Sequence, residues 1–536
     1  MKPPLLLALL LLPIAPSCSS EAGAAAALVS PPSRDGWSTE SAWPGYTLVA
    51  PLTSQSVHLV DMAGEIVHSW ATASKPGVAV YLTERGTLLK CHRVIDHPTF
   101  QDAGGHGGWI QELDWNGDVL WDFRWDSEDG LNHHDIEPLP NGNILMIAWD
   151  RTTRDVGLAA GRDPELLEGE EFWAGAVYEI KPTPPEGAEV VWSWHALDHV
   201  IQDHDAKLPN YGVPSKHPER IDINGDRDPA PPDEEEEAEL QAQMEALGYA
   251  GGGDDEDDDV EDDDDGGDEE EEEEDPEDAA RRARVKHADW MHTNSVDYNA
   301  ELDQIVISVR RYDEVWILDH SITAEEAKGP KGDLLYRWGN PHAYGMGEWE
   351  ERDLFGQHHV QWIPDGYLGA GNLIVFNNGA RPREHSTIDE WWAPRDAQGH
   401  YPREASGRWG PTEAAWTYAA DEPEEFFSPF ISGVQRLPNG NTLICSGAQG
   451  WVFEVTPAGE VVWDWKSPFG PDPGDEDDDL KKFPTALFRA ERFAADDPAI
   501  AALRAKGAAI PLDPGTGPAT NQYVPPPEED AAEEDD

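Results

Sequence analysis

The sequence predicts an all-β fold, a six-bladed β-propeller, because two phrases recur along the chain. The first phrase has a histidine or serine in one slot ahead of a turn such as Pro-Asn-Gly-Asn, and it occupies residues 134–143, 358–364 and 432–441, with a looser copy at 292–298. The second phrase is a β-rich run, a turn with Gly or Pro and an aromatic-rich run ending in Trp, and it occurs six times. A radial array of such units forms a propeller.

Each unit is expected to contain four antiparallel strands. In residues 432–465, one strand begins at the slot, the chain turns at Pro-Asn-Gly-Asn and returns, and two more strands follow. Val, Ile, Trp and Tyr recur between glycine turns, which is a strand and hairpin signal. The unit that starts at Tyr46 lacks its own first strand. Residues 485–493 are expected to supply that strand and close the ring.

The propeller is expected to span residues 44–495, with two polar segments outside its repeat. The chain has 536 residues and a formal net charge of −69, and 28 of its acidic residues lie within 233–278, which contains no Lys or Arg. This stretch belongs to an insertion at 207–285, and we expect it to be disordered because it cannot bury enough apolar area to offset chain entropy. Residues 496–536 form an extension with an acidic tail. A protein with this much negative charge repels the phosphate backbone of nucleic acids, so nucleic-acid partners are not expected.

Residues 1–18 have the pattern of a signal peptide, with a short basic end and an apolar run of secretory length. The run Ala-Pro-Ser-Cys resembles a bacterial lipobox, which predicts lipidation of Cys18 and an anchored protein in the periplasm or at the cell surface; simple secretion is the alternative. No later segment is apolar enough to cross a bilayer, so membrane contact is expected only through this anchor. Cys91 and Cys445 are expected to be small buried hydrophobes, with a disulfide as the alternative.

Histidines at one register of the repeat predict a site, because the first strand of each blade lines the central channel. His134, His292 and His358 open that strand in the third, fourth and fifth units. Arg310 ends the return strand that follows His292, so it comes back to the same mouth, as Asn378 does in the next unit. His92 and Arg93, with Asn377, end return strands in the same way.

Such a mouth gathers nitrogen donors inside a strongly acidic protein, which favours an anionic ligand. The alternative for each histidine is a capping or packing role, and the tryptophans that end the units are expected to be packing residues. Three histidines also suit zinc, with Asp135 to complete the shell. A neighbouring arginine opposes a bound cation, so no metal is expected.

Several motifs resemble the bacterial arylsulfotransferase family. They are Asp-Trp-Met-His-Thr-Asn-Ser-Val-Asp-Tyr-Asn at 289–299, the strand at 302–310, Tyr-Arg-Trp-Gly-Asn-Pro at 336–341, Gly-Gln-His at 356–358 and Phe-Asn-Asn-Gly at 376–379. The resemblance runs from about residue 44 to 493, outside the acidic insertion. The family is a six-bladed propeller, which agrees with the six units counted above.

The resemblance implies transfer of a sulfuryl group from a phenolic sulfate ester to a phenol, without a nucleotide donor or a cofactor, through a sulfated histidine. His358 matches the family's nucleophile. His292, Arg310 and His134 match residues that bind the sulfuryl group, although His133 leaves a one-residue ambiguity, and Asn378 is also expected at the substrate.

Two features depart from the family pattern. Well-known members carry an N-terminal β-sandwich domain, for which no room is expected here, so the oligomeric state is open. His359 follows the nucleophile directly, and the acidic insertion precedes His292. The rival functions are a non-catalytic propeller that binds an anionic ligand or a protein partner at this mouth, and a metal-dependent hydrolase.

Overall fold

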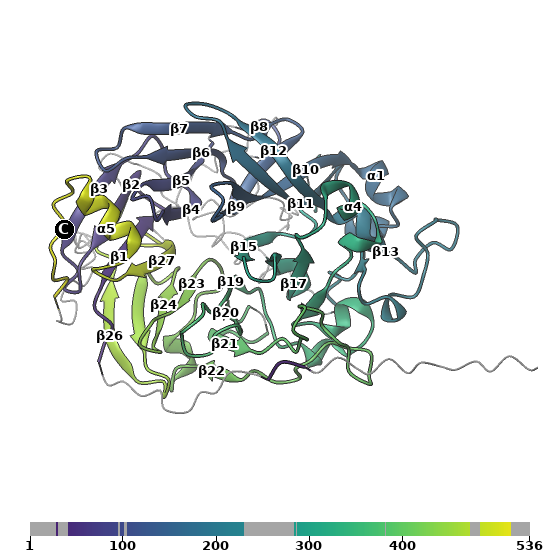
Figure 1. The fold of residues 1–536 in the computed structure, drawn as a ribbon. Coiled ribbons are helices and arrows are strands. Elements are labelled where there is room, and N and C mark those ends of the chain that lie inside the picture. The colour runs from purple at the N-terminus through teal and green to yellow at the C-terminus, as the bar shows by residue number, and fades with distance from the viewer. Residues whose placement is uncertain are drawn as a thin grey trace, which may run out of the picture.

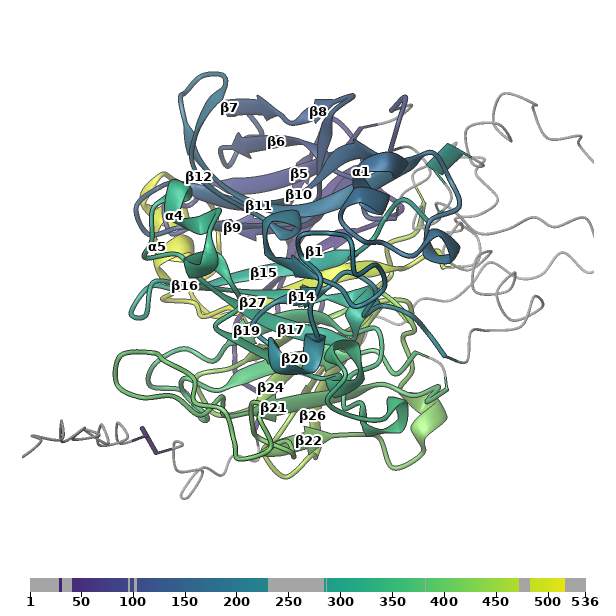
Figure 2. The same cartoon turned by 90° about the vertical axis from the view of Figure 1, so that its right-hand side faces the viewer.

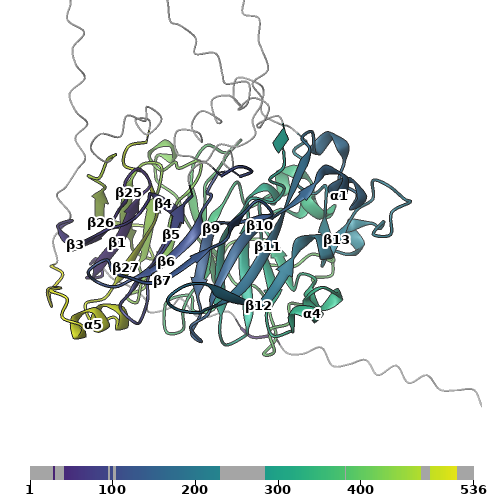
Figure 3. The same ribbon diagram turned by 90° about the horizontal axis from the view of Figure 1, so that it is seen from above.

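Six antiparallel sheets surround a central channel in the computed structural model, so the chain is a six-bladed β-propeller (Figure 1). The structure describes residues 28–30, 41–94, 97–100, 104–229, 284–285, 287–380, 382–471 and 483–515. The views from the side show the strands of neighbouring blades stacked side by side around the axis (Figures 2 and 3).

The strands of each blade follow one another outward from the channel. In the first three blades they are β27 (Leu487–Phe493), β1 (Tyr46–Pro51), β2 (Ser56–Val60) and β3 (Ile66–Ala71); β4 (Pro76–Leu82), β5 (Leu88–Arg93), β6 (Gly108–Leu113) and β7 (Val119–Arg124); and β9 (Gly130–Pro138), β10 (Ile144–Thr153), β11 (Glu171–Pro182) and β12 (Ala188–His195), with short β8 (Asp126–Ser127) paired to β9.

In the last three blades the strands are β15 (Thr293–Asn299), β16 (Gln304–Val309), β17 (Glu314–Asp319) and β18 (Tyr336–Trp338); β19 (His358–Trp362), β20 (Leu373–Asn377), β21 (Thr387–Trp391) and β22 (Trp416–Tyr418); and β23 (Gly433–Arg436), β24 (Thr442–Ser446), β25 (Trp451–Val455) and β26 (Val461–Lys466).

Short elements connect and flank the blades. They are the helices α1 (Arg154–Ala159), α4 (Ala324–Ala327) and α5 (Pro498–Ala505), the strands β13 (Val200–Ile201) and β14 (Ile221–Asp222), and the 3-10 turns η1 (Pro164–Leu166), η2 (Ala196–His199), η3 (Pro214–Lys216), η4 (Arg310–Tyr312), η5 (Pro330–Gly332), η6 (Pro341–Tyr344), η7 (Trp349–Glu351) and η8 (Pro423–Glu425). No helix of the described ranges is both long and apolar enough to cross a membrane.

The C-terminal strand closes the ring. β27 pairs antiparallel with β1, so it is the innermost strand of the first blade, and the prediction that residues 485–493 supply this strand is confirmed. The Arg492 side chain then reaches Glu454 in the last blade at 2.5 Å, with both side chains fully buried. The two ends of the propeller are therefore joined by backbone pairing and by a buried ion pair.

The structure explains why an asparagine ends the Pro-Asn-Gly-Asn turn. The last residue of the turn precedes the second strand, and its side-chain amide donates to a glutamate on the third strand of the same blade, which satisfies a carboxylate held between sheets. The pairs are Asn143 with Glu179 and Asn441 with Glu454, each at 2.6 Å, and Asn372, which ends a longer turn of different sequence, makes the same contact with Glu390 at 2.6 Å. The tryptophans that end the units are core residues, as predicted; Trp70, Trp121, Trp194 and Trp465 are all at most 2 % exposed.

The predictions for the cysteines and for the insertion can be compared with the structure where the residues are described. Cys91 in β5 and Cys445 in β24 are both buried free thiols in different blades, so the small-hydrophobe interpretation is confirmed and the disulfide is not formed. In the insertion, residues up to 229 pack on the propeller, where Asp226 pairs with the buried Arg162. The acidic stretch 233–278 and the predicted signal with Cys18 lie outside the described residues.

Candidate active site

The inner strands of three consecutive blades carry histidines to one end of the channel. β9, β15 and β19 each have a β-bulge where the histidine phrase lies, and a bulge re-aims the side chains of its strand. His134 and His292 take left-handed backbone conformations there, with φ of 52° and 47°. This conformation is costly for a residue with a side chain, and such strain gathers at functional sites.

Four side chains meet at this end: His134, His292, His358 and Arg310. The rings of His134 and His292 lie edge to face with centroids 4.6 Å apart. His358 and Arg310 both interact electrostatically with these two histidines. The backbone amide of Arg310 donates to the His292 carbonyl at 3.2 Å, so β16 ends beside that histidine. These are the four residues that the sequence predicted to gather at one mouth.

His358 presents one ring nitrogen to the site and anchors the other. Its Nδ1 lies 2.8 Å from Asn378 Oδ1 and 3.1 Å from the Gly356 carbonyl, and both oxygens can only accept, so Nδ1 carries the proton. Nε2 is buried and has no hydrogen-bond partner within the described part of the chain. The ring therefore directs an unprotonated nitrogen lone pair into the site.

The amide of Asn378 is fixed from its other side. Its Nδ2 donates to the carbonyls of Ser428 at 2.7 Å and Ile431 at 2.8 Å, which leaves Oδ1 to face His358. The sequence placed Asn378 at the mouth as a substrate-binding residue. The structure places it against His358 instead, where it sets the orientation and tautomer of the ring; contact with a substrate stays a prediction.

Asp289 is a site residue that the sequence analysis did not single out. Its carboxylate accepts from His292 Nδ1, and its other oxygen accepts from the Trp149 indole at 2.9 Å and from the backbone amide of His292 at 3.2 Å. The available signal was the spacing Asp-Trp-Met-His within the recognised motif, since a carboxylate three residues before a histidine at a strand entrance is within reach of its ring.

His134 and His133 divide their roles by direction. The His134 ring faces His292, whereas the His133 ring stacks on Trp149 with centroids 3.9 Å apart, and the two Nδ1 atoms lie 2.8 Å from each other. A Cβ atom on Gly105 would lie 2.2 Å from His134 Nε2, so glycine is required there to leave room for the ring. The backbone of the preceding blade thus helps to hold His134.

Burial sets the charge of the site. It lowers the pKa of His134 and His358 well below the usual value, and the interactions with Arg310 and with the ring of His292 lower both further, so both rings are neutral at pH 7. Burial also lowers the pKa of His292, against the opposing effect of Asp289. Arg310 is the permanent cation among neutral imidazoles, an arrangement that suits an anion bearing several oxygens.

The fourth ligand that the zinc hypothesis requires, Asp135, does not lie with the three histidines. Asp135 turns away from the histidines and pairs with Arg489 at 2.7 Å while it accepts from the Tyr81 hydroxyl at 2.7 Å. Within the ranges that the structure describes, no group of three or more His, Cys, Asp or Glu side chains is arranged to hold a metal ion.

Comparison with known proteins decides the family. The family model described as arylsulfotransferase (ASST) matches residues 54–464, most of the chain. The chain belongs to the arylsulfotransferase family. A curated relative, the arylsulfate sulfotransferase AssT of Escherichia coli O6:H1, is 26% identical over 183 residues, which cover 31% of this chain and 29% of that protein. The match thus spans under a third of the relative's length.

Solved structures resemble this chain only distantly. A protein of unknown function from Bacteroides caccae has a TM-score of 0.40 at 11% identity and covers 84% of this chain and 99% of its own. The virginiamycin B lyase of Staphylococcus aureus has a TM-score of 0.33 at 7% identity and covers 80% of this chain and 82% of its own. The assignment of six blades rests on the strand pairing described above.

Not every predicted neighbour joins the cluster of His134, His292, His358 and Arg310. His92 turns into its own blade, where Nδ1 contacts Ser74 at 3.2 Å. Arg93 donates to His106 at 3.2 Å. The ring of His359 lies on the far side of β19, where its Nδ1 accepts from the Val434 amide at 3.0 Å.

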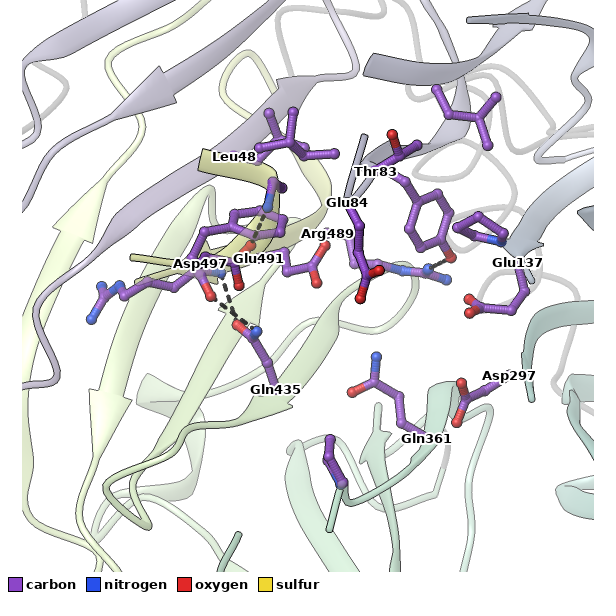
Figure 4. A pocket seen from close by; sticks show the side chains of 18 of the residues that line it. Leu48, Thr83, Glu84, Glu137, Asp297, Gln361, Gln435, Arg489, Glu491 and Asp497 are labelled. Carbon is purple, nitrogen blue, oxygen red and sulfur yellow. Dashed lines mark hydrogen bonds between the residues drawn. The ribbon is translucent and has the colours of Figure 1, made fainter. Parts of the chain in front are cut away.

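The other end of the channel opens into a cavity of about 710 Å³ whose walls carry carboxyl groups (Figure 4). Glu137, Asp297 and Glu491 stand near the ends of the inner strands, and burial raises the pKa of Asp297 and of Glu491 to about 7. The Arg489–Asp135 pair lies between this cavity and the histidines. The two ends of the channel therefore differ in chemistry: carboxyl groups line this cavity, whereas imidazoles and Arg310 gather at the other end.

Proposed function

We propose that this arylsulfotransferase moves a sulfuryl group from a phenolic sulfate ester to a phenolic acceptor through a sulfated His358, without a nucleotide donor. The observation that carries the proposal is the state of His358: Nδ1 is held by Asn378, and the buried Nε2 faces the site with no hydrogen-bond partner in the described ranges. A neutral imidazole whose lone pair is directed at the substrate is a competent nucleophile near pH 7.

The neighbouring side chains support this transfer. As Nε2 bonds to sulfur, negative charge moves onto the three free sulfuryl oxygens and the departing aryl oxygen. Arg310 stabilises the sulfuryl oxygens by charge, and His134 and His292 contribute ring nitrogens, as preorganised clamps do in phosphoryl transfer. The acceptor phenol then attacks the same sulfur, and the N–S bond breaks.

Location and partners follow the same proposal. The donor and acceptor are small phenolic molecules, and the apolar run of residues 1–18 with Cys18 supports export to the periplasm or cell surface with a lipid anchor. Binding energy for the donor then comes from its sulfate, which the Arg310 cation recognises.

The test is an assay of sulfuryl transfer from 4-nitrophenyl sulfate to phenol. The quantity measured is the release of 4-nitrophenol. We expect release by the wild type and a loss of at least about 1,000-fold in kcat for His358→Ala, because removing a nucleophile removes the covalent route. The matched control is His92→Gln, which alters a buried histidine directed into its own blade. After quenching without acceptor, mass spectrometry should find a sulfated peptide containing His358.

Three results would reject the proposal in favour of a rival. Undiminished release by His358→Ala supports a non-catalytic propeller with a contaminating activity. Retention of an aryl sulfate by the wild type without release supports an anion-binding propeller. Release that a chelator abolishes and zinc restores supports a metal-dependent hydrolase.

A further inference from the structure

The leaving phenolate needs a proton, and the structure distinguishes among the imidazoles that lie near it. Phenols have a pKa near 10, so departure as a free phenolate is slow unless a positioned acid supplies a proton. Arg310 does not release its proton near neutral pH. The source must therefore be His134, His292 or His358, and His358 Nε2 is occupied by the new bond to sulfur.

Only His292 of these three has a carboxylate against its ring among the described residues. Asp289 is 6% exposed, and both of its oxygens are engaged: one by the ring Nδ1 of His292, the other by the Trp149 indole and the His292 backbone amide. A carboxylate held in this way stabilises an imidazolium and fixes the tautomer of the neutral ring.

His134 has neighbours of a different kind. Its Nδ1 faces the neutral ring of His133, and the titratable groups that act on it most strongly, His292, His133, His358 and Arg310, disfavour its protonation. The carboxylate nearest in sequence, Asp135, is committed to Arg489. A proton delivered to this cluster therefore resides on His292.

We infer that Asp289 is a positioning residue that makes His292 the proton carrier of both half-reactions. The inference deepens the proposed function and rests on it. In the first half-reaction, His358 Nε2 bonds to sulfur, the S–O bond breaks, and the aryl oxygen takes its electron pair and the Nε2 proton of His292. In the second, the acceptor phenol gives its proton to His292 Nε2 as its oxygen bonds to sulfur, and the N–S bond returns its pair to His358.

The proton enters with the donor. Before the donor binds, burial and the charges of Arg310 and Arg311 hold the pKa of His292 below its usual value, in spite of Asp289, so the ring is neutral. A bound sulfate ester adds negative charge beside Arg310 and offsets that cation. His292, with its carboxylate, is then the ring that gains a proton, so anion binding and proton uptake are coupled.

The decisive experiment compares two donors on Asp289→Asn. 4-Nitrophenolate leaves far more readily than phenolate and needs little proton transfer. We expect kcat/KM to fall on the order of 100-fold with phenyl sulfate but less than about 10-fold with 4-nitrophenyl sulfate. Equal losses with the two donors would mean a merely structural role and overturn the inference. His134→Gln serves as comparison, because loss of a sulfuryl-binding group should lower both donors by similar factors.

A second measurement does not depend on turnover. Titration calorimetry of inorganic sulfate at pH 7 in buffers of different ionisation enthalpy reports the protons taken up on binding. We expect close to one proton per sulfate for the wild type and a clear reduction for Asp289→Asn. Sulfate binding without proton uptake would overturn the inference even if transfer is observed. Proton-coupled binding without any transfer by the wild type would keep the Asp289–His292 assignment and reject the proposed function, and no sulfate binding would reject both.

Discussion

The Nδ1 atom of His358 lies 2.8 Å from Oδ1 of Asn378, and the amide of Asn378 cannot turn over without losing two hydrogen bonds of its own. Each net hydrogen bond of this kind contributes about 1 kcal/mol, and a buried unsatisfied carbonyl costs more. The backbone carbonyls of Ser428 and Ile431 therefore fix the tautomer of His358 indirectly, because they orient the Asn378 amide that accepts from its Nδ1. Ring position and ring chemistry are set by the same contact.

Replacing Asn378 with Leu should impair the chemical step more than donor binding. The shape is similar, but His358 loses the acceptor that holds the proton on Nδ1, so a fraction of rings carries the proton on Nε2 and cannot attack. We expect kcat to fall about 10- to 100-fold with little change in KM. Nitrogen-15 NMR of labelled histidine should show the Nδ1–H tautomer in the wild type and a mixture in the variant; an unchanged tautomer with reduced kcat would contradict this explanation.

Gly105→Ala should displace His134. The new Cβ would lie 2.2 Å from His134 Nε2, and φ at this glycine is 74°. The control is Gly117→Ala, at a φ of 86° in a turn where the nearest atom to the new Cβ is 3.9 Å away. Both variants place an alanine at a positive φ, which costs about 1 kcal/mol of stability. Only Gly105→Ala should raise the KM for the donor several-fold. Similar kinetics for the two variants would show that His134 has room to move.

Glu454→Gln should weaken the closure of the ring. Burial lowers the pKa of Arg492 to about 10 although Glu454 opposes this effect, so the guanidinium depends on its partner to remain charged in the core. Removing one member of a buried pair costs about 3–5 kcal/mol of unfolding free energy. The control is Arg85→Ala, which breaks the exposed pair with Glu112 and should cost under about 1 kcal/mol. Equal denaturation midpoints for the two variants would mean that backbone pairing alone closes the ring.

Much of the propeller could be predicted from the sequence because its signals are local and repeated. Turn residues, alternating apolar positions and a missing first strand are read within one unit, and the pairing of β27 with β1 follows from closure. The gathering of His134, His292, His358 and Arg310 follows from the same symmetry, because equivalent positions of a radial repeat face one axis.

The direction of individual side chains could not be predicted in this way. The bulges at the histidine phrases and the left-handed φ of His134 depend on partners in neighbouring blades, such as Gly105. The Asp289 carboxylate is oriented by the Trp149 indole and the Asn378 amide by the carbonyls of Ser428 and Ile431, contacts that carry no periodic signal. The Arg489–Asp135 pair joins β27 to β9, which are far apart in the sequence. Such long-range polar pairing has no signature in one unit.

The acidic end of the channel should make stability fall as pH rises. Burial and the neighbouring carboxylate Asp135 raise the pKa of Asp297 to about 7, although the Trp362 amide, 2.7 Å from the carboxylate, acts in the opposite direction. An unfolded aspartate titrates near 3.9, so between that pH and 7 the folded state holds the proton more tightly. This contribution is complete below the unfolded pKa and is lost as pH rises through 7.

Asp297→Asn has no carboxyl group to ionise and should flatten this dependence. We expect its Tm at pH 8 to exceed that of the wild type by a few degrees, with a smaller difference at pH 5, because only the wild type must bury a charge at the higher pH. The control is Asp118→Asn in an exposed turn. The Tm profile of this variant should run parallel to that of the wild type. Thermal unfolding from pH 5 to 8 measures all three proteins, and an Asp297→Asn profile parallel to the wild type would show that its carboxyl ionises in the folded protein as it does in the unfolded chain.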